Sequence, residues 1–225
     1  MPSRGKLLAQ AAAKFTAGFA LLAALLFLPA GTLRYPGAWR LLALLLAPMA
    51  ALGAVLLVRA PALLEKRLRS REKAPAQRRV VAASALMFAC AFLLAGLDFR
   101  LGLTRTPGWL TALASVLQLA AYGLYAEVLR ENAFLSRTIE VQPGQTLVDT
   151  GLYGVIRHPM YAATLVLFLC MPLVLGSFLA FAAMLAYPPL IVLRIRGEER
   201  MLLAQLPGYR GYVQRVRWRL VPFLW

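Results

Sequence analysis

The segment 151–161 holds several side chains that could take part in chemistry. It reads Gly-Leu-Tyr-Gly-Val-Ile-Arg-His-Pro-Met-Tyr and contains His158, the only histidine of the chain. Proline disfavours helix at the residue before it and fits the first position of a helix. We therefore predict a helix that begins at Pro159, with His158 at its cap and Tyr161 in its first turn. The free N–H groups of such an end, beside Arg157, can receive a carboxylate or phosphate. Alternatively, Arg157 and His158 anchor a helix at lipid headgroups.

A second polar cluster follows the next apolar run. Residues 194–199 read Arg-Ile-Arg-Gly-Glu-Glu. Arg194 and Glu198 are four residues apart and would share one face of a helix. They could form an ordinary surface ion pair, or a pocket for a zwitterionic ligand. In such a pocket the arginine would bind a carboxylate, and the glutamates an ammonium or sulfonium group.

The elements that position these clusters are apolar runs. The chain is 61% hydrophobic and 15% charged, whereas soluble domains have roughly 45–50% and 25%. Runs 15–31, 38–58, 80–97 and 109–126 are long enough to cross a bilayer. The run 161–193 is too long for one crossing and has Gly176-Ser177 near its middle. We expect two short helices, 161–175 and 178–193, in a hairpin; one Pro-kinked helix is the alternative. The predicted fold is an all-α, polytopic membrane helix bundle with five to six transmembrane segments, the last two forming a helical hairpin.

Membrane topology explains the net charge of +16 better than nucleic acid does, and no stacking platform or recognition helix stands out. With the N-terminus in the cytoplasm, the inside segments 1–14, 59–79, 127–160 and 194–225 hold all but four of the 25 Lys and Arg. The exceptions are Arg34, Arg40, Arg100 and Arg105. The positive-inside rule thus predicts cytoplasmic termini and a cytoplasmic site around His158. Richness in Ala, Leu and Arg favours a bacterial inner membrane.

The remaining polar segments have simpler interpretations. The basic segment 59–79 is expected to touch anionic headgroups, with direct substrate binding as the alternative. Segment 206–225 alternates aromatic and basic residues, which predicts an interfacial helix and an apolar tail that could cover a pocket. Cys90 and Cys170 lie in apolar runs and are expected to be core residues, so we predict no metal site. We divide the chain into N-terminal transmembrane helices, 1–126, and a catalytic region, 127–225.

The order of the motifs over 130–225 carries a family resemblance. Gly-x-Tyr-x-x-x-Arg-His-Pro-x-Tyr, a hydrophobic hairpin, Arg-x-x-x-Glu-Glu-x-x-Leu and Tyr-x-x-Tyr-x-x-Arg-Val follow one another. This series resembles the isoprenylcysteine carboxyl methyltransferase family, and phospholipid methyltransferases share a looser version. Two positions depart from it. Ala163 stands where members often have glycine, and Leu206-Pro207-Gly208 replaces the usual Phe-Gly.

The resemblance implies an integral membrane methyltransferase that uses S-adenosylmethionine. Its acceptor would be lipophilic and would come from the bilayer: an isoprenylcysteine-type carboxylate or a lipid headgroup. Arg194 and Glu198 match positions near the reacting centre, and Asn132 stands where many members carry asparagine. The positions implied in or beside the cofactor pocket are Gly151, Tyr153, Arg157, His158, Pro159, Tyr161, Glu198 and Glu199.

Two other functions compete with this one. Sterol-reductase-like membrane enzymes that use NADPH carry a related His-Pro-x-Tyr or His-x-Asn-Tyr element. Here Met160, not asparagine, precedes Tyr161, and the Glu198-Glu199 pair fits the methyltransferases better. The third possibility is a non-catalytic membrane module whose basic segments bind anionic lipid.

Overall fold

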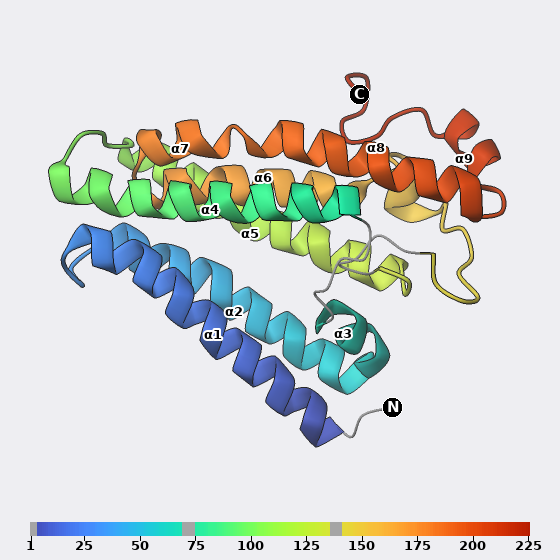
Figure 1. The fold of residues 1–225 in the computed structure, drawn as a ribbon, viewed down its shortest axis with the longest axis horizontal. Helices are drawn as coiled ribbons and strands as arrows, with labels where there is room; N and C mark the ends of the chain where they lie inside the picture. Colours follow the sequence, from blue (N-terminus) through green and yellow to red (C-terminus); the bar gives the residue numbers. More distant parts are fainter. Residues whose placement is uncertain (1–3, 69–74, 136–140) are drawn as a thin grey trace.

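A computed structural model of the chain describes residues 4–68, 75–135 and 141–225, and every regular element in these ranges is helical (Figure 1). The α-helices are α1 (Arg4–Ala30), α2 (Pro36–Arg59), α3 (Pro61–Leu68), α4 (Pro75–Leu101), α5 (Gly108–Glu131), α6 (Pro159–Leu175), α7 (Phe178–Met184), α8 (Tyr187–Gln205) and α9 (Tyr209–Arg215). A short 3₁₀ turn, η1, spans Gly151–Gly154.

The long helices have the length and composition of membrane spans. Among the described residues, α1, α2, α4, α5 and the stretch Phe178–Gln205 qualify, and α6 is a shorter apolar helix. Many large apolar side chains remain on the outer surface, for example Leu28 (76% exposed) and Val116 (64%). Soluble proteins rarely expose so large an apolar surface to water, whereas a bilayer would cover it with lipid. The predicted polytopic helical bundle is therefore confirmed. The first predicted span ends one residue beyond α1, and the next three lie within α2, α4 and α5.

The bundle consists of α4, α5, α6 and the α7–α8 arm, and the α1–α2 pair leans against it (Figure 1). The main apolar core joins the second half of α1 and the first half of α2 to α4, α5 and α6. Glycines permit close backbone approach at this junction. A Cβ at Gly37 would lie 2.4 Å from the Leu175 carbonyl oxygen, and one at Gly96 would lie 2.6 Å from that of Leu26.

The run 161–193 folds back on itself, as the hairpin prediction required. Gly176 ends α6 in the left-handed conformation, with φ of 91°. Ser177 caps α7, and its Oγ accepts a hydrogen bond from the Ala180 N–H at 3.0 Å. A left-handed glycine followed by a serine N-cap stops one helix and starts the next. The two arms then run antiparallel, which excludes a single kinked helix.

The second arm differs from its prediction as one helix over 178–193. Helix α7 ends at Met184, and α8 begins at Tyr187 and runs on to Gln205. Pro188 and Pro189 lack the N–H groups that would continue the ladder from α7, but they fit the first turn of a new helix. The break therefore lies just before the proline pair.

The polar segments lie near the end of the bundle where α6 begins. In the basic segment 59–79, α3 covers 61–68, and residues 69–74 lie outside the described ranges. Lys66 Nζ donates to the Ala133 carbonyl at 3.3 Å, so α3 contacts the segment after α5. The predicted C-terminal helix is α9, which is short. The cytoplasmic orientation of this end and the division of the chain at 126/127 stay predictions.

Candidate active site

Helix α6 begins where the proline rule placed it. Pro159 is its first residue, and His158 is the N-cap, with no side-chain capping bond. The residues Arg157 and His158 are buried, each at 5% exposure. A charged side chain is rarely buried without a partner. The structure supplies that partner from α8.

Glu199 is the common partner of three basic side chains. Its Oε1 accepts from Arg157 Nε at 2.8 Å and lies 3.3 Å from His158 Nε2. Its Oε2 accepts from Arg219 Nε at 2.8 Å. Because Glu199 is itself 7% exposed, this cluster is a buried ion-pair network. We call these four residues the Glu199 cluster.

The Glu199 cluster also fastens the C-terminal segment to the start of α6. The backbone N–H groups of Arg157 and His158 donate to the carbonyls of Trp218 and Arg219, each at 2.9 Å. Arg157 Nη1 donates to the Val216 carbonyl at 2.8 Å and to that of Arg217 at 3.2 Å. The C-terminal segment, which was predicted to cover a pocket, is thus joined to residues 157–158 by backbone hydrogen bonds that the carbonyls of residues 218–219 accept. Nη1 of Arg157 donates to the C-terminal segment, while its Nε donates to Glu199.

A second cluster joins α6 to α8 one turn further along. Tyr161 Oη donates to Glu198 Oε2 at 2.6 Å and accepts from Arg194 Nε at 3.2 Å. Tyr161 is buried, and the other two side chains are partly buried. The tyrosine hydroxyl therefore fixes the carboxylate and the guanidinium relative to each other. The hairpin brings these residues together across more than thirty positions of sequence, which the hairpin prediction anticipated.

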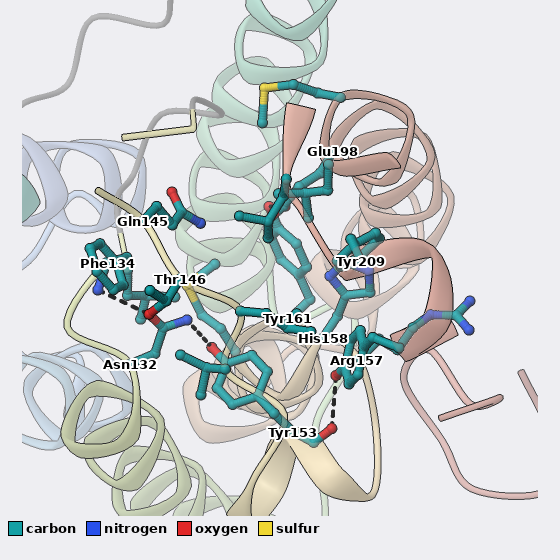
Figure 2. Close-up of a pocket in the computed structure, with 18 of the residues that line it drawn as sticks. Asn132, Phe134, Gln145, Thr146, Tyr153, Arg157, His158, Tyr161, Glu198 and Tyr209 are labelled. Atoms are coloured by element: carbon teal, nitrogen blue, oxygen red, sulfur yellow. Dashed lines mark hydrogen bonds between the residues drawn. The ribbon is translucent and has the colours of Figure 1, made fainter. Parts of the chain in front are cut away.

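Both clusters border one cavity between α6, α8, α9 and the segment after α5. Figure 2 shows Glu198, His158 and Tyr209 on one side of it, opposite Asn132 and Thr146. Its other polar lining residues are Gln145, Tyr153, Arg157, Tyr161, Arg194 and Tyr212, and its apolar lining residues are Phe134, Leu135, Leu147, Val148, Met160, Met201, Leu202 and Leu206. The enclosed space is about 90 Å³.

Of the predicted site residues, Gly151, Pro159 and Glu199 do not line this cavity. Gly151 has φ of 53°, and a Cβ there would lie 1.7 Å from Glu131 Oε1. The Glu131 carboxylate accepts from the Leu152 N–H at 3.1 and 3.0 Å. Gly151 thus permits a tight turn against Glu131, and Glu199 lies behind the cavity wall.

The opposite wall is held by the residue that follows α5. Asn132 Nδ2 donates to Tyr153 Oη at 3.0 Å, and its Oδ1 accepts from the Phe134 N–H at 2.9 Å (Figure 2). Burial raises the pKa of Tyr153 to about 12, and the negative charges of Glu198 and Glu131 act in the same direction, against opposing effects of Asn132 and Arg67. Tyr153 is therefore a neutral hydroxyl at physiological pH.

Tyr209 is one of several lining residues that the sequence-based site set omitted. Its hydroxyl is buried and has no hydrogen-bond partner among the residues that the structure describes. Burial, and then the charges of Glu199 and Glu198, raise its pKa well above the usual value. The hydroxyl therefore stays protonated and can donate to a ligand. Its spacing of three from Tyr212, after Pro207-Gly208, was a usable signal, because these positions share a helix face.

Comparisons with known proteins agree with the resemblance found in the sequence. Residues 112–204 match the model of the isoprenylcysteine carboxyl methyltransferase family. Methanethiol S-methyltransferase 2 of Bradyrhizobium diazoefficiens is 34% identical over 118 residues, which are 52% of this chain and 43% of that protein. The Delta(14)-sterol reductase of Mus musculus is 30% identical over 91 residues, which are 39% of this chain and 22% of that protein. This chain thus spans less than half the length of either relative.

A solved structure shares the fold. The eukaryotic intramembrane Ras methyltransferase, an isoprenylcysteine carboxyl methyltransferase, superimposes with a TM-score of 0.56 over 93% of this chain and 75% of that one, at 20% identity. The family match ends at residue 204. It therefore contains Tyr161, Arg194 and Glu198, and it ends before Tyr209.

Proposed function

We propose that this chain is an integral membrane methyltransferase that uses S-adenosylmethionine and acts on a lipophilic acceptor. The observation that carries the proposal is the Tyr161–Glu198–Arg194 cluster. The cluster lies inside the region that matches the methyltransferase family model, and it faces the cavity. A carboxylate and a guanidinium held at one point suit a reaction between a cationic donor and an anionic acceptor.

The residues of the cavity fit the proposed cofactor in their chemistry. Glu198 supplies a carboxylate for a positive group, and the Tyr209 hydroxyl supplies a donor for a carboxylate or ribose oxygen. The apolar walls, with Leu202 and Leu206 among them, suit a purine ring. The space of about 90 Å³ is smaller than the roughly 300–1,000 Å³ of most ligand pockets. We therefore expect the walls to move apart when the cofactor binds.

The chain's own residues would position the reactants and exclude water. When bound, S-adenosylmethionine supplies an activated methyl group on a sulfonium sulfur. Glu198, fixed by Tyr161, would hold a positive group of the cofactor, and Arg194 would orient the anionic group of the acceptor. Holding two reactants in line can account for much of a methyl transfer rate. The apolar walls would keep competing water away from the reacting atoms.

Within the proposal, the residues behind the wall are positioning residues. The Glu199 cluster fixes the start of α6 against α8 and the C-terminal segment. It thereby keeps His158 and Tyr161 at the cavity. Gly151 and Pro159 would act in the same indirect way, through the turn and the helix start that they permit.

The proposed acceptor enters from the bilayer and reacts at the cytoplasmic side. Leu193, the neighbour of Arg194 on α8, is 52% exposed, so the proposed route to Arg194 runs along an apolar surface. An isoprenylcysteine-type carboxylate or a lipid headgroup would present an anionic group there. The bacterial relative is named for a thiol acceptor. A thiolate would also suit the guanidinium.

One observation favours a second candidate, an NADPH-dependent reductase: the similarity to a sterol reductase over 91 residues. Calorimetry separates the two on the purified chain. We expect S-adenosylhomocysteine to bind with a saturable heat and NADPH to give none. Saturable binding of NADPH with no heat from S-adenosylhomocysteine would overturn the methyltransferase proposal.

Replacing Tyr209 by phenylalanine is expected to weaken S-adenosylhomocysteine binding by roughly 3–10-fold, the effect of one neutral hydrogen bond. Stability should hardly change, because the hydroxyl has no partner among the described residues. The matched control is Tyr122→Phe, whose lost hydroxyl donates to the Leu45 carbonyl at 2.8 Å and does not line the cavity. We expect the control to lower the unfolding free energy by about 1–3 kcal/mol and to bind normally. Equal affinities for Tyr209→Phe and wild type would remove Tyr209 from the site.

A further inference from the structure

A second and larger cavity lies at the other end of the bundle. It is about 590 Å³ and is lined by the starts of α2 and α5, the end of α4, the connection 102–106 and the hairpin tip. The first cavity is bordered by Asn132 and this one by Thr111, at opposite ends of α5 (Figure 1). At about 1.5 Å of rise per residue they are roughly 30 Å apart. The second cavity is therefore no part of the methyl-transfer site.

Part of the lining of this cavity is a hydrogen-bonded polar cluster around Asp98. Asp98 is 1% exposed, and its Oδ1 accepts from the Thr104 N–H at 2.7 Å. Its Oδ2 accepts from the hydroxyls of Thr104 and Ser177. The Phe178 N–H donates to Thr104 Oγ1 at 3.0 Å, which ties the connection to the hairpin tip. Three donors satisfy most of the hydrogen-bonding capacity of the Asp98 carboxylate.

Two arginines from separate elements border the same cavity. Arg40 comes from α2, and Arg105 comes from the connection 102–106 between α4 and α5. Among the residues that the structure describes, neither guanidinium has a hydrogen-bond or ion-pair partner. Asp98 is occupied by its own donors, and the hydroxyls of Thr106, Thr111 and Ser115 are hydrogen-bonded within the protein. The side chains left to recognise a ligand are therefore these two cations. Such a set suits a phosphate group.

The surroundings of the cavity indicate a ligand that comes from the membrane. Large apolar side chains are exposed at this end, including Trp109 (68%), Leu103 (60%) and Trp39 (49%). Tryptophan beside arginine is typical of the boundary between hydrocarbon and headgroups. Arg40 and Arg105 are also two of the four arginines that the positive-inside rule leaves on the outer side. Topology therefore does not account for them.

We propose that this cavity binds the phosphate-bearing headgroup of an anionic phospholipid, with Arg40 and Arg105 on the phosphate. The acyl chains lie along the exposed apolar faces next to Trp109 and Leu103. The lipid ties α2 and the connection 102–106 to the hairpin tip. This site is distinct from any headgroup contact of α3, the described helix of the basic segment, which lies at the opposite end of the bundle.

Native mass spectrometry of the purified chain in neutral detergent tests the proposal. Dioleoylphosphatidylglycerol is titrated against wild type, the double variant Arg40→Gln/Arg105→Gln and the matched control Arg34→Gln/Arg100→Gln. The control removes two arginines of the same end that do not line the cavity. We expect one tightly held lipid on wild type and control, and binding at least about tenfold weaker in the cavity variant. Dioleoylphosphatidylcholine should bind weakly to all three.

Three results would overturn the proposal. The first is equal phosphatidylglycerol binding by the cavity variant and wild type, and the second is equal binding of phosphatidylcholine by wild type. In the third, glycerol 3-phosphate alone displaces the lipid at equal concentration, and the ligand is then a soluble anion. The melting temperature without lipid shows whether the double variant folds. If it does not, the single variants Arg40→Gln and Arg105→Gln are compared with Arg34→Gln in the same titration.

Discussion

Replacing Glu198 by glutamine is expected to lower methyl transfer by roughly 10–100-fold, with most of the loss in cofactor affinity. Glutamine keeps the size of the side chain and can still accept the hydrogen bond from Tyr161 Oη. It removes the negative charge that we propose faces the cationic cofactor. A hydrogen bond to a charged group is worth about 1.5–3 kcal/mol, and 1.4 kcal/mol corresponds to a factor of ten. Calorimetry with S-adenosylhomocysteine and a turnover assay measure the two effects separately.

Glu127→Gln is the matched control for this substitution. Glu127 forms a partly exposed pair with Arg130 at 2.6 Å on α5 and does not line the cavity. Solvent-exposed pairs of this kind contribute little to stability, so turnover should stay within about twofold of wild type. Arg194→Ala should lower turnover by a larger factor than it weakens cofactor binding, because we place Arg194 on the acceptor. If Glu198→Ala and Arg194→Ala both kept wild-type turnover and cofactor affinity, the role assignment would be wrong.

Replacing Glu199 by alanine is expected to lower the unfolding free energy by about 3–5 kcal/mol, as removal of one partner from a buried ion pair does. The change would leave Arg157, His158 and Arg219 facing one another without a carboxylate. Arg157 and His158 cannot turn to water, because their side chains are 3% and 4% exposed. Denaturant titration in detergent measures the loss.

The Glu199→Ala substitution should also loosen the C-terminal segment. The Glu199 cluster holds residues 216–219 against the start of α6. We therefore expect Glu199→Ala to expose the segment beyond α9 to protease at concentrations that leave wild type intact. Glu198→Ala, one position away and partly buried, serves as the control and should lose under about 1.5 kcal/mol. Equal stabilities for the two alanine variants would show that the cluster is not needed to hold this end together.

Most of the fold could be predicted from local rules because the bilayer restricts the choice of structure. Apolar runs of sufficient length must be helices there, and all four N-terminal spans were placed in this way. The proline rule gave the start of α6 at Pro159, and Gly176-Ser177 gave the hairpin tip. The break between α7 and α8 was missed. Pro188 and Pro189 were read as part of one arm, although prolines favour the first turn of a helix.

Six of the nine predicted site residues line the cavity, but their arrangement could not be predicted. Adjacent helix residues point about 100° apart, so Glu198 and Glu199 had to face different partners. Which of the two glutamates faces the cavity depends on how α8 is rotated about its axis relative to α6. This rotation cannot be predicted from a single sequence. Arg219 joins Glu199 because backbone bonds pair residues 157–158 with 218–219. No sequence motif near either segment predicts this backbone pairing.

The most direct test of the central claim is methyl transfer itself. Membranes that contain the chain are incubated with S-adenosylmethionine labelled in its methyl group, and the lipid and small-molecule products are separated and counted. We predict a labelled lipophilic product that is absent from membranes without the chain, strongly reduced with Glu198→Gln and retained with Glu127→Gln. A wild-type preparation that binds S-adenosylhomocysteine but labels no lipophilic acceptor, or that labels one equally well with Glu198→Gln, would contradict the account.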